Sequence, residues 1–482
     1  MKLHFALHLL PMITVFAQIV ADPPTAHSPI RLSAVSDPTT GRSAFSFEGK
    51  HEPPVIRAVP GDSIRITYRN EMSSTTHSKC ATGPCMNMTN LHFHGLHVSP
   101  NSPQDDVLSM AAMPGESLEY KVDIPPNQPP GLYWYHPHAH GESYKQVLDG
   151  MSGAIVIEGI ERYVPAIRRM RERILVLRDR AFDKDDPEAK RLRDVAEIPP
   201  QSCGTSTEQL ERVFTVNGAV RPEIPIAAGE RQFWRIVNAS PDLYADLEVD
   251  GELWEILALD GMPLAYHDPK HPTQRATHVL LPPAGRLEAI VTGPRGRARA
   301  KLRTRCFDTG PDGDSNPSMV LADLVDVKTD ASDSQTPARD MQKPAFVPLP
   351  ETTLTALETR TPEFTVTFTE DKQEFYINDT RFGLSDAPMT RVAVGGYHHW
   401  RIVNKTREVH PFHIHQVHFL FYSTNGHPAK EPEWLDTVNV AAEGSVDLIM
   451  DFTDPIIRGV SVFHCHLLNH EDKGMMAKIL FE

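Results

Sequence analysis

A cysteine, three histidines and a thioether lie close together near the end of the chain, in the run His464-Cys465-His466-Leu467-Leu468-Asn469-His470-Glu471-Asp472-Lys473-Gly474-Met475. One thiolate, two imidazoles and a weak axial thioether form the ligand set of a blue-copper electron-transfer site. Cys465, His470 and Met475 could supply three of these four ligands. Because successive side chains of a β-strand point to opposite faces, His464 and His466 would share the face opposite Cys465. A strand here could therefore connect an electron-accepting copper to a second metal centre behind it.

His-x-His pairs recur along the chain far more often than chance allows. The 24 histidines in 482 residues predict roughly 1.2 such pairs, yet the sequence contains five, at 92/94, 136/138, 138/140, 413/415 and 464/466. On a strand, each pair presents both rings to one face, and neutral imidazole is a favoured ligand for copper, zinc, iron and nickel. Eight histidines from four pairs can hold several metal ions, more than one zinc site requires.

Length and composition indicate a multidomain, all-β protein. A chain of 482 residues is long enough for about three domains of roughly 150 residues each. Its 42 prolines and 28 glycines, together with short apolar runs, favour many short strands joined by turns. The net charge of −15 argues against nucleic acid as the main partner.

The sequence also repeats itself at an interval of about 170 residues, which is too long for a solenoid repeat. Trp234-Arg235-Ile236-Val237-Asn238 returns as Trp400-Arg401-Ile402-Val403-Asn404, and a weaker echo runs over 60–70. Such a pattern is typical of three copies of one β-sandwich.

Three domains are expected, joined by a linker at 326–344 that is rich in Asp, Ser, Thr and Pro. Their approximate bounds are 28–160, 161–328 and 346–482. All the histidine pairs fall in the first and third of these, so a shared metal cluster would lie at their interface. The second domain would then be a spacer that sets their geometry.

The N-terminus resembles a secretory signal, with one lysine, an apolar stretch over 5–20 and small residues near its end. We expect a signal peptide at 1–21, cleaved after Ala17 or Ala21, and export to the periplasm or the medium. No other run of about 18 apolar residues is found, so no stable membrane span is expected in the mature protein.

Five cysteines fit an exported protein. Apart from Cys465, Cys80 and Cys85 are near enough in sequence to close a small loop, and Cys203 and Cys306 could form a long-range bridge. Four cysteines can pair in three ways, and the sequence does not choose among them. Free thiols at Cys203 and Cys306 are the alternative.

Together, the four histidine motifs resemble the multicopper oxidases of the bacterial laccase and copper-efflux-oxidase type, over nearly the whole mature chain. The resemblance implies an all-β fold of three consecutive cupredoxin-like Greek-key β-sandwiches. It also implies four copper ions: one type 1, one type 2 and a type 3 pair. By position, the type 1 ligands would be His410, Cys465 and His470 with Met475 axial, and the type 2 ligands His92 and His413. The type 3 ligands would be His94, His136, His138, His415, His464 and His466.

The same resemblance implies an oxidase that couples one-electron oxidation of a donor to the four-electron reduction of dioxygen to water. Two carboxylates would supply protons: Asp105 or Asp106 after the first motif, with Asp106 preferred, and Glu471 directly after His470. Asp436 would lie either near the substrate side or behind a metal ligand, which it would orient.

Two donors compete. Copper-efflux oxidases carry a methionine-rich insertion for Cu(I), whereas 316–345 holds only the isolated Met319 and Met341, which favours phenols and aromatic amines, the laccase donors. The run Glu471–Met476 favours exported oxidation of Cu(I) for copper tolerance. The alternative class is a non-catalytic cupredoxin scaffold or copper-binding protein, which lost ligands would indicate; none is lost. A monomer is expected, because one chain would assemble the whole cluster. His97 and His418 fill no ligand position and are expected to be exposed or hydrogen-bonded.

Overall fold

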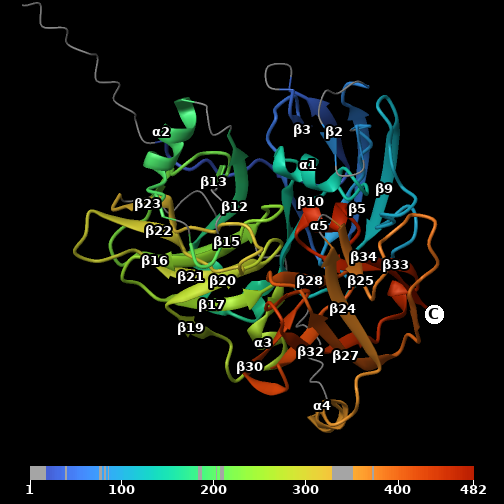
Figure 1. Ribbon diagram of the computed structural model, residues 1–482. Coiled ribbons are helices and arrows are strands. Elements are labelled where there is room, and N and C mark those ends of the chain that lie inside the picture. Colours follow the sequence, from blue (N-terminus) through green and yellow to red (C-terminus); the bar gives the residue numbers. More distant parts are fainter. Residues whose placement is uncertain are drawn as a thin grey trace, which may run out of the picture.

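Three consecutive pairs of β-sheets make up the protein. The structure is a computed structural model, and it describes residues 18–482 except 38–40, 75–78, 81–82, 85, 183–186, 202, 207–210, 328–350 and 372–373. In Figure 1 the first pair (blue to cyan) lies above the third (orange to red), and the second (green to yellow) lies beside both. The pairs span 25–157, 171–325 and 364–481 and are called the first, second and third sandwich. The prediction of an all-β, three-sandwich fold is confirmed.

The first sandwich joins a five-stranded sheet, β1-β4-β11-β10-β8, to a four-stranded sheet, β3-β2-β5-β9. On β5 the residues alternate between buried and exposed, and its buried Ile64, Ile66 and Tyr68 pack between the two sheets. Its elements are β1 (Thr25–Ala26), β2 (Ile30–Ser36), β3 (Ser43–Ser46), β4 (Val55–Ala58), β5 (Ser63–Glu71), a β6–β7 hairpin (Lys79–Cys80 and Gly83–Pro84), β8 (His92–His94), β9 (Ser117–Asp123), β10 (Gly131–His136), α1 (Ser143–Leu148) and β11 (Gly153–Ile157).

The second sandwich pairs a seven-stranded sheet with a five-stranded one. Two short 3-10 helices, η1 (Ile160–Arg162) and η2 (Pro165–Arg169), connect it to the first sandwich, and α2 (Pro187–Val195) and α3 (Leu264–His267) lie between its strands along the chain. Its strands are β12 (Arg171–Ala181), β13 (Arg212–Val216), β14 (Glu223–Pro225), β15 (Arg231–Asn238), β16 (Ala245–Val249), β17 (Trp254–Leu259), β18 (Met262–Pro263), β19 (Gln274–Ala276), β20 (His278–Leu281), β21 (Arg286–Thr292), β22 (Arg299–Arg305) and β23 (Met319–Val325).

The third sandwich pairs a six-stranded sheet, β25-β24-β27-β32-β29-β30, with a five-stranded sheet, β26-β34-β33-β28-β31. Its strands are β24 (Phe364–Asp371), β25 (Glu374–Ile377), β26 (Thr390–Val392), β27 (Gly396–Asn404), β28 (His410–Ile414), β29 (Phe419–Thr424), β30 (His427–Leu435), β31 (Thr437–Val440), β32 (Ser445–Phe452), β33 (Gly459–Cys465) and β34 (Met476–Phe481). Its helices are α4 (Glu351–Glu358), η3 (Pro455–Ile457) and α5 (Leu468–Asp472).

The repeated Trp-Arg-Ile-Val-Asn element occupies the same place in two sandwiches. β15 pairs in parallel with β12 and antiparallel with β21, and β27 pairs in parallel with β24 and antiparallel with β32. Trp234 and Trp400 are both fully buried in their respective cores. The repeat is therefore structural, since a large apolar ring fixes each central strand against the opposite sheet.

A short N-terminal strap joins the second sandwich to the first. Ile19 forms a β-bridge with Glu223, and Val20 is buried in the core of the second sandwich. The chain then enters the first sandwich at β1. Residues 19 and 20 thus contact the second sandwich, and the place where the expected signal peptide ends stays a prediction. Residues 1–17 lie outside the described part of the chain.

Of the expected cysteine bridges, the long-range one is formed. Cys203 and Cys306 are disulfide-bonded, with 5.7 Å between their Cα atoms, so the free-thiol alternative is wrong. The expected small loop between Cys80 and Cys85 falls outside the side chains that the structure describes. So does the linker at 326–344, apart from its first two residues. No helix within the described residues is long and apolar enough to cross a membrane.

Candidate metal centres

The last strands of the third sandwich build a site around the buried Cys465. Its Sγ lies 3.5 Å from Nδ1 of His410 and 4.0 Å from Nδ1 of His470, and those two nitrogens are 3.3 Å apart. Met475 is fully buried beside them, and its backbone bonds to both Cys465 and His470. We call these four residues the cysteine site. All come from one sandwich, on β28, β33 and the segment around α5.

The two histidines of the cysteine site are held with Nδ1 toward the sulfur. Nε2 of His410 is 2.8 Å from the Thr406 hydroxyl, so an N–H at that position leaves the lone pair on Nδ1. The ring of His470 stacks on Phe375 with 3.9 Å between centroids. Burial lowers the pKa of His410 to about 3 and that of His470 well below its usual value, so both rings are neutral and able to bind a metal.

Eight further histidines meet where the first and third sandwiches touch, and we call them the histidine cluster. They divide into compact groups that could each hold a metal ion. The groups are His94, His136 and His466; His138, His415 and His464; and His92, His94 and His413. The first two groups split the six expected type 3 ligands into two sets of three, and the third contains both expected type 2 ligands.

Strand alternation places these rings. On β8, Phe93 faces the core of the first sandwich while His92 and His94 face the interface. On β33, Cys465 and Phe463 face the core of the third sandwich, and His464 belongs to the cluster behind them. Opposing rings stack across the interface, His92 on His415 at 3.8 Å and His94 on His413 at 3.9 Å between centroids.

Unpaired ring nitrogens show that the cluster fits a set of cations. Nε2 of His92, His136 and His413 is buried and has no hydrogen-bond partner, while Nδ1 of each is fixed by an oxygen. A buried polar atom without a partner costs about 1–3 kcal/mol, and several such atoms converge here. Burial also lowers the pKa of all eight rings, so each is neutral and carries a free lone pair. Neutral imidazole is a favoured ligand of copper, as it is of zinc, iron and nickel, so the donor set fits copper ions.

Asp105, and not Asp106, is the carboxylate that contacts the cluster. Both Asp105 oxygens lie 3.0 Å from Nδ1 of His92, and Gln416 donates to Oδ2 at 2.7 Å. Asp106 instead accepts the backbone N–H groups of Leu108 and Ser109, and so caps a local turn. In the structure the bend at these residues turns Asp105 toward the cluster and Asp106 toward its own turn, and the proton-relay role preferred for Asp106 stays a prediction.

Glu471 lies at the other side of the cluster. Its carboxyl group is fully buried, accepts a hydrogen bond from the Ser143 hydroxyl at 3.3 Å and lies 3.6 Å from Nδ1 of His138. Burial and the neighbouring Asp472 raise its pKa well above the usual value, so Glu471 holds a proton at neutral pH. Asp472 binds the backbone N–H groups of Gly141 and Tyr144, which fixes α5 against the start of α1.

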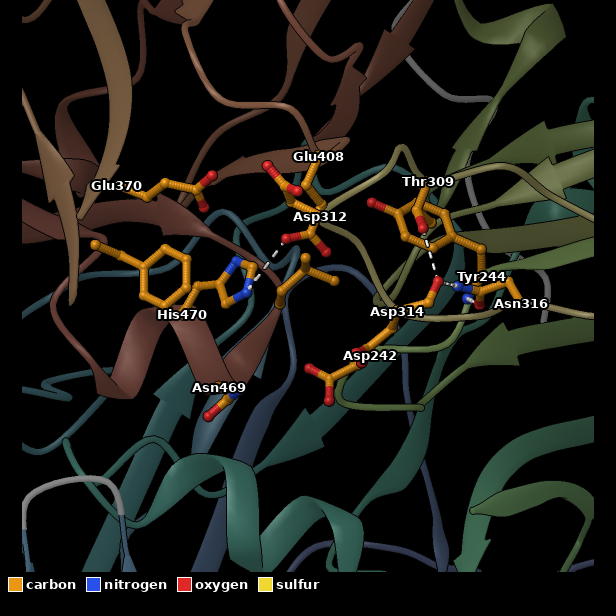
Figure 2. Close-up of a pocket in the computed structure, with 12 residues that line it drawn as sticks. Asp242, Tyr244, Thr309, Asp312, Asp314, Asn316, Glu370, Glu408, Asn469 and His470 are labelled. Carbon is orange, nitrogen blue, oxygen red and sulfur yellow. Dashed lines mark hydrogen bonds and ion pairs between the residues drawn. The ribbon is translucent and has the colours of Figure 1, made fainter. Parts of the chain in front are cut away.

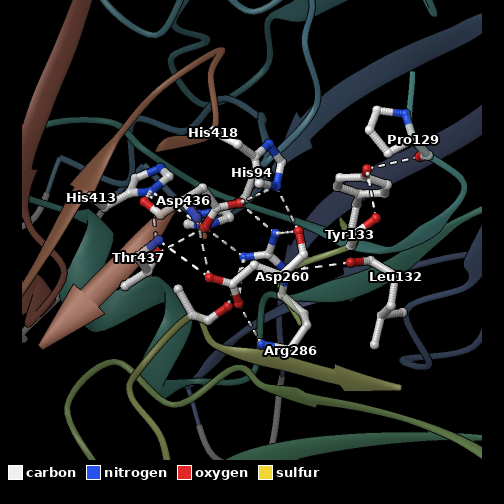
Figure 3. Close-up of polar contacts among 12 residues, drawn as sticks. His94, Pro129, Leu132, Tyr133, Asp260, Arg286, His413, His418, Asp436 and Thr437 are labelled. Atoms are coloured by element: carbon white, nitrogen blue, oxygen red, sulfur yellow. Dashed lines mark hydrogen bonds and ion pairs between the residues drawn. The ribbon is translucent and has the colours of Figure 1, made fainter. Parts of the chain in front are cut away.

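Asp436 orients cluster ligands, the second of its two expected positions. Its Oδ1 lies 3.2 Å from Nε2 of His94, and its backbone oxygen accepts from Nδ1 of His413 at 2.7 Å (Figure 3). Burial alone would raise the pKa of this carboxyl, but the guanidinium of Arg286 lowers it to about 2. Neither Arg286 nor the adjacent Asp260 was anticipated from sequence, because both come from the second sandwich and lie in no motif. The second sandwich is thus more than a spacer.

Two other histidines are structural, as expected. His97 and His418 hydrogen-bond to each other at 2.6 Å, and His418 also contacts the backbone oxygen of Asp260 at 2.8 Å. The pair joins the first sandwich to the third, and His418 joins the third to the second through Asp260.

An acidic cavity of about 350 Å³ opens over His470 (Figure 2). Nε2 of His470 lies 3.6 Å from Oε2 of Glu408, whose pKa burial and nearby carboxylates raise to about 9. The second sandwich supplies half of its lining. The lining residues are Asp242, Tyr244, Thr309, Asp312, Asp314, Asn316, Glu370, Phe375, Glu408, Leu467, Asn469 and His470.

Comparisons with known proteins give the class to which this fold and these sites belong. Two family models described as multicopper oxidase match 32–162 and 354–482, together more than half of the chain. The chain belongs to the multicopper oxidase family and is an oxidoreductase. Membership of this family implies copper as the cofactor, which agrees with the buried donors described above.

Individual relatives are distant but similar over most of their length. A laccase from Bacillus stratosphericus is 24% identical over 482 residues, covering 90% of this chain and 89% of that protein. The multicopper oxidase structure from Campylobacter jejuni, described as a metallo-oxidase, matches with a TM-score of 0.70 at 22% identity over 96% of this chain and 95% of the other. McoA from Aquifex aeolicus matches with a TM-score of 0.72 at 20% identity, covering 97% and 99%. These structures support the cupredoxin-type fold.

Proposed function

We propose that the protein oxidises a donor one electron at a time at the cysteine site and uses the electrons to reduce dioxygen to water at the histidine cluster. The observation that carries this proposal is the pairing of two buried donor sets back to back on one strand, β33. The cysteine site would hold the type 1 copper, with Met475 axial. His92 and His413 would hold the type 2 copper, and the other six cluster histidines the type 3 pair.

Bound copper would supply the one-electron chemistry at the cysteine site and the four-electron reduction at the cluster. The chain supplies the connection between them. Cys465 is bonded through its backbone to His464 and His466, so two short covalent paths run from the sulfur to rings in two different cluster groups. The sandwiches also exclude water, since none of the eight cluster rings is more than 2% exposed.

Proton delivery is assigned to Glu471 and Asp105. Glu471 is held in its protonated form beside His138 and can donate inward, while Ser143 donates to Oε1, the same carboxyl oxygen that faces His138. Asp105 lies on the opposite side of the cluster and is kept in place by Gln416 and the backbone of Phe93. In this proposal Asp105 takes the relay role that the sequence suggested for Asp106, and Glu471 keeps its own.

The donor enters through the cavity over His470. A laccase-like phenol or aromatic amine is the first candidate, supported by the missing methionine-rich segment. The acidic lining favours a second candidate, a cationic donor such as Cu(I), because the four carboxyl groups of the lining besides Glu408 raise the local concentration of cations. Both donor classes occur among the relatives described above, one as a laccase and one as a metallo-oxidase.

Export and domain limits are part of the same proposal. A disulfide between Cys203 and Cys306 persists in an oxidising compartment, which supports secretion or a periplasmic location. We place the domains at 28–160, 161–328 and 346–482, and the active species as a monomer. The non-catalytic scaffold is disfavoured, because every expected ligand is present and buried.

Oxygen consumption by the copper-loaded protein tests the proposal, with a phenol and with Cu(I) as parallel donors. Cys465→Ser is the matched variant, since it keeps the shape of the side chain and removes the thiolate. Turnover with either donor that disappears in Cys465→Ser supports electron entry at the cysteine site. No turnover with either donor, in protein that binds its full copper complement, would mean a copper-binding protein instead.

A further inference from the structure

The second sandwich carries a buried arginine that reaches the histidine cluster. Arg286 is the first residue of β21, and its side chain is fully buried. Nη1 donates to Oδ1 of Asp436 at 2.8 Å, and Nη2 donates to Oδ2 of the same carboxylate. Such a two-pronged pair fixes the plane of the carboxylate as well as its position.

The guanidinium is itself held from several sides (Figure 3). Nη2 also donates to the backbone oxygen of Asp260 at 2.7 Å, Nη1 to that of Ala284 at 3.1 Å, and Nε to that of Leu132 at 3.3 Å. Leu132 belongs to β10, the strand that ends at His136. Arg286 therefore connects elements of all three sandwiches at one point, and it cannot turn without breaking several hydrogen bonds.

The pair determines how His94 presents itself. A carboxylate bound by a guanidinium only accepts hydrogen bonds, so Nε2 of His94, 3.2 Å from Oδ1 of Asp436, must carry the N–H. The lone pair is then on Nδ1, which is buried and unpaired. His94 is thus the reverse of His92 and His136, whose Nδ1 atoms bond to oxygens and whose Nε2 atoms are unpaired.

The space behind His94 is filled by this pair. A Cβ atom built on Gly95 would lie 2.6 Å from Nη2 of Arg286 and 2.6 Å from Oδ2 of Asp436. The absence of a side chain at Gly95 is what lets the arginine–aspartate pair approach the ligand strand so closely. The pair and the strand that carries His94 are therefore fitted to each other.

We infer that Arg286 is a positioning residue of the histidine cluster: through Asp436 it fixes the tautomer and the orientation of His94, and so makes the second sandwich part of the metal centre. The inference rests on the proposed function, because it assigns a role in holding the cluster ions. It extends that function by giving the sandwich without metal ligands a direct part in shaping the cluster.

Arg286→Lys tests the inference, because lysine keeps the positive charge and loses the planar guanidinium that binds both oxygens of Asp436. Three properties are measured on the copper-reconstituted protein: copper per chain, the near-ultraviolet and electron paramagnetic resonance signals of the cluster, and the blue absorption of the cysteine site. We expect a copper affinity of the cluster that is about 10- to 100-fold weaker, with altered cluster signals and an unchanged blue band.

Arg235→Lys is the matched control. Arg235 is a buried arginine of the neighbouring strand β15 that binds Glu172 and Glu288 and touches no cluster ligand. It should lower stability and leave the cluster signals unchanged. If Arg286→Lys behaves like Arg235→Lys in every signal, the positioning role is overturned and Arg286 only joins the sandwiches.

Asp436→Asn serves where Arg286→Lys does not fold, because it keeps the shape of the side chain and leaves only one acceptor oxygen between Arg286 and His94. The same altered cluster signals with an intact blue band support the inference, and wild-type signals overturn it. The wild-type protein separates this result from the proposed function. If the wild type itself takes up no cluster copper and consumes no oxygen, the proposed function fails, and the inference falls with it.

Discussion

The cysteine site and the histidine cluster share one strand but are built in opposite ways. All four residues of the cysteine site come from a single sandwich, over residues 410–475. The histidine cluster takes half of its rings from the first sandwich and half from the third, and the second sandwich holds Asp436 through Arg286. The cysteine site therefore depends on one folding unit, whereas the histidine cluster depends on how three units are assembled.

Removing one ligand from each site in turn tests whether the two sites are built separately, and it has the largest expected effect. His92→Ala takes a ligand from the first sandwich, so we expect loss of oxygen consumption with retention of the blue absorption. His410→Ala should abolish the blue absorption and leave the signals of the cluster unchanged. Absorption, copper content and oxygen uptake measure both. Loss of both sites in either variant would contradict their separate construction.

The free energy of unfolding of the metal-free protein should fall with pH because of the cluster histidines. In the metal-free protein the cluster rings are neutral with lowered pKa, whereas the unfolded chain protonates them below about pH 6.5. The unfolded state then binds more protons, so stability falls as pH falls. Each such ring contributes about 1.4 kcal/mol per pH unit below that value. Urea unfolding of the metal-free protein between pH 7.5 and about 5 measures the slope.

The copper-loaded protein is the control for this acid effect. Ions bound to the rings compete with protons, so the loaded form should keep its urea midpoint to a lower pH than the metal-free form. Equal pH dependence of the two forms would show that the cluster rings are not the groups responsible. An engineered loss of one ring, His92→Ala, should make the metal-free slope shallower.

Two neighbouring carboxylates sharpen the comparison at the edge of the cluster. Asp105→Asn replaces one of the two carboxylate oxygens at Nδ1 of His92 by an amide NH2 group and removes the charge, and we expect turnover to fall by about 10- to 100-fold. Asp106→Asn alters only a turn, so turnover should stay within about twofold of the wild type, with a stability change near 0.5 kcal/mol. Steady-state oxygen uptake compares them. A larger loss in Asp106→Asn would restore the preference drawn from sequence.

The smallest effect is expected at the donor cavity. Asp312→Asn together with Asp314→Asn removes two negative charges from the lining and leaves the cysteine site untouched. We expect KM for Cu(I) to rise by about two- to fivefold, since partly exposed charges contribute about 0.2–1 kcal/mol each, while KM for a neutral phenol stays constant. Asp268→Asn, exposed and outside the cavity, is the control. An equal change for both donors would show that charge does not select the donor.

Sequence was sufficient for features that local spacing determines. The alternation of a strand predicts that His464 and His466 lie opposite Cys465, and the spacing of each His-x-His pair predicts two rings on one face. What failed depends on contacts between distant segments. Arg286 lies 150 residues from Asp436, and no pattern around it marks it as different from other strand arginines. Sequence could not show which of Asp105 and Asp106 faces the cluster, because the geometry of the turn that carries them decides it.

The acidic cavity is a second feature that sequence could not predict, because it is built from distant segments. Its carboxyl groups come from loops of the second sandwich, from β24 (Glu370) and from the loop before β28 (Glu408), so no window of the sequence contains them together. The three-sandwich fold was easier, because repeated elements such as Trp234 and Trp400 are visible within short stretches. Fold and ligands were therefore readable from local pattern, whereas the groups that tune them were not.

One ladder of hydrogen bonds specifies both metal centres at once. On β28 and β33, Phe412 lies opposite Cys465 and His413 lies opposite His464. A slip of one residue in this pairing would turn Cys465 toward the interface and the histidines into the apolar core. A chain with the wrong register would thus lose both sites together and would lack the absorption band of the cysteine site. A blue absorption from the proposed type 1 copper would therefore report on strand register and would separate correctly folded molecules from compact misfolded ones.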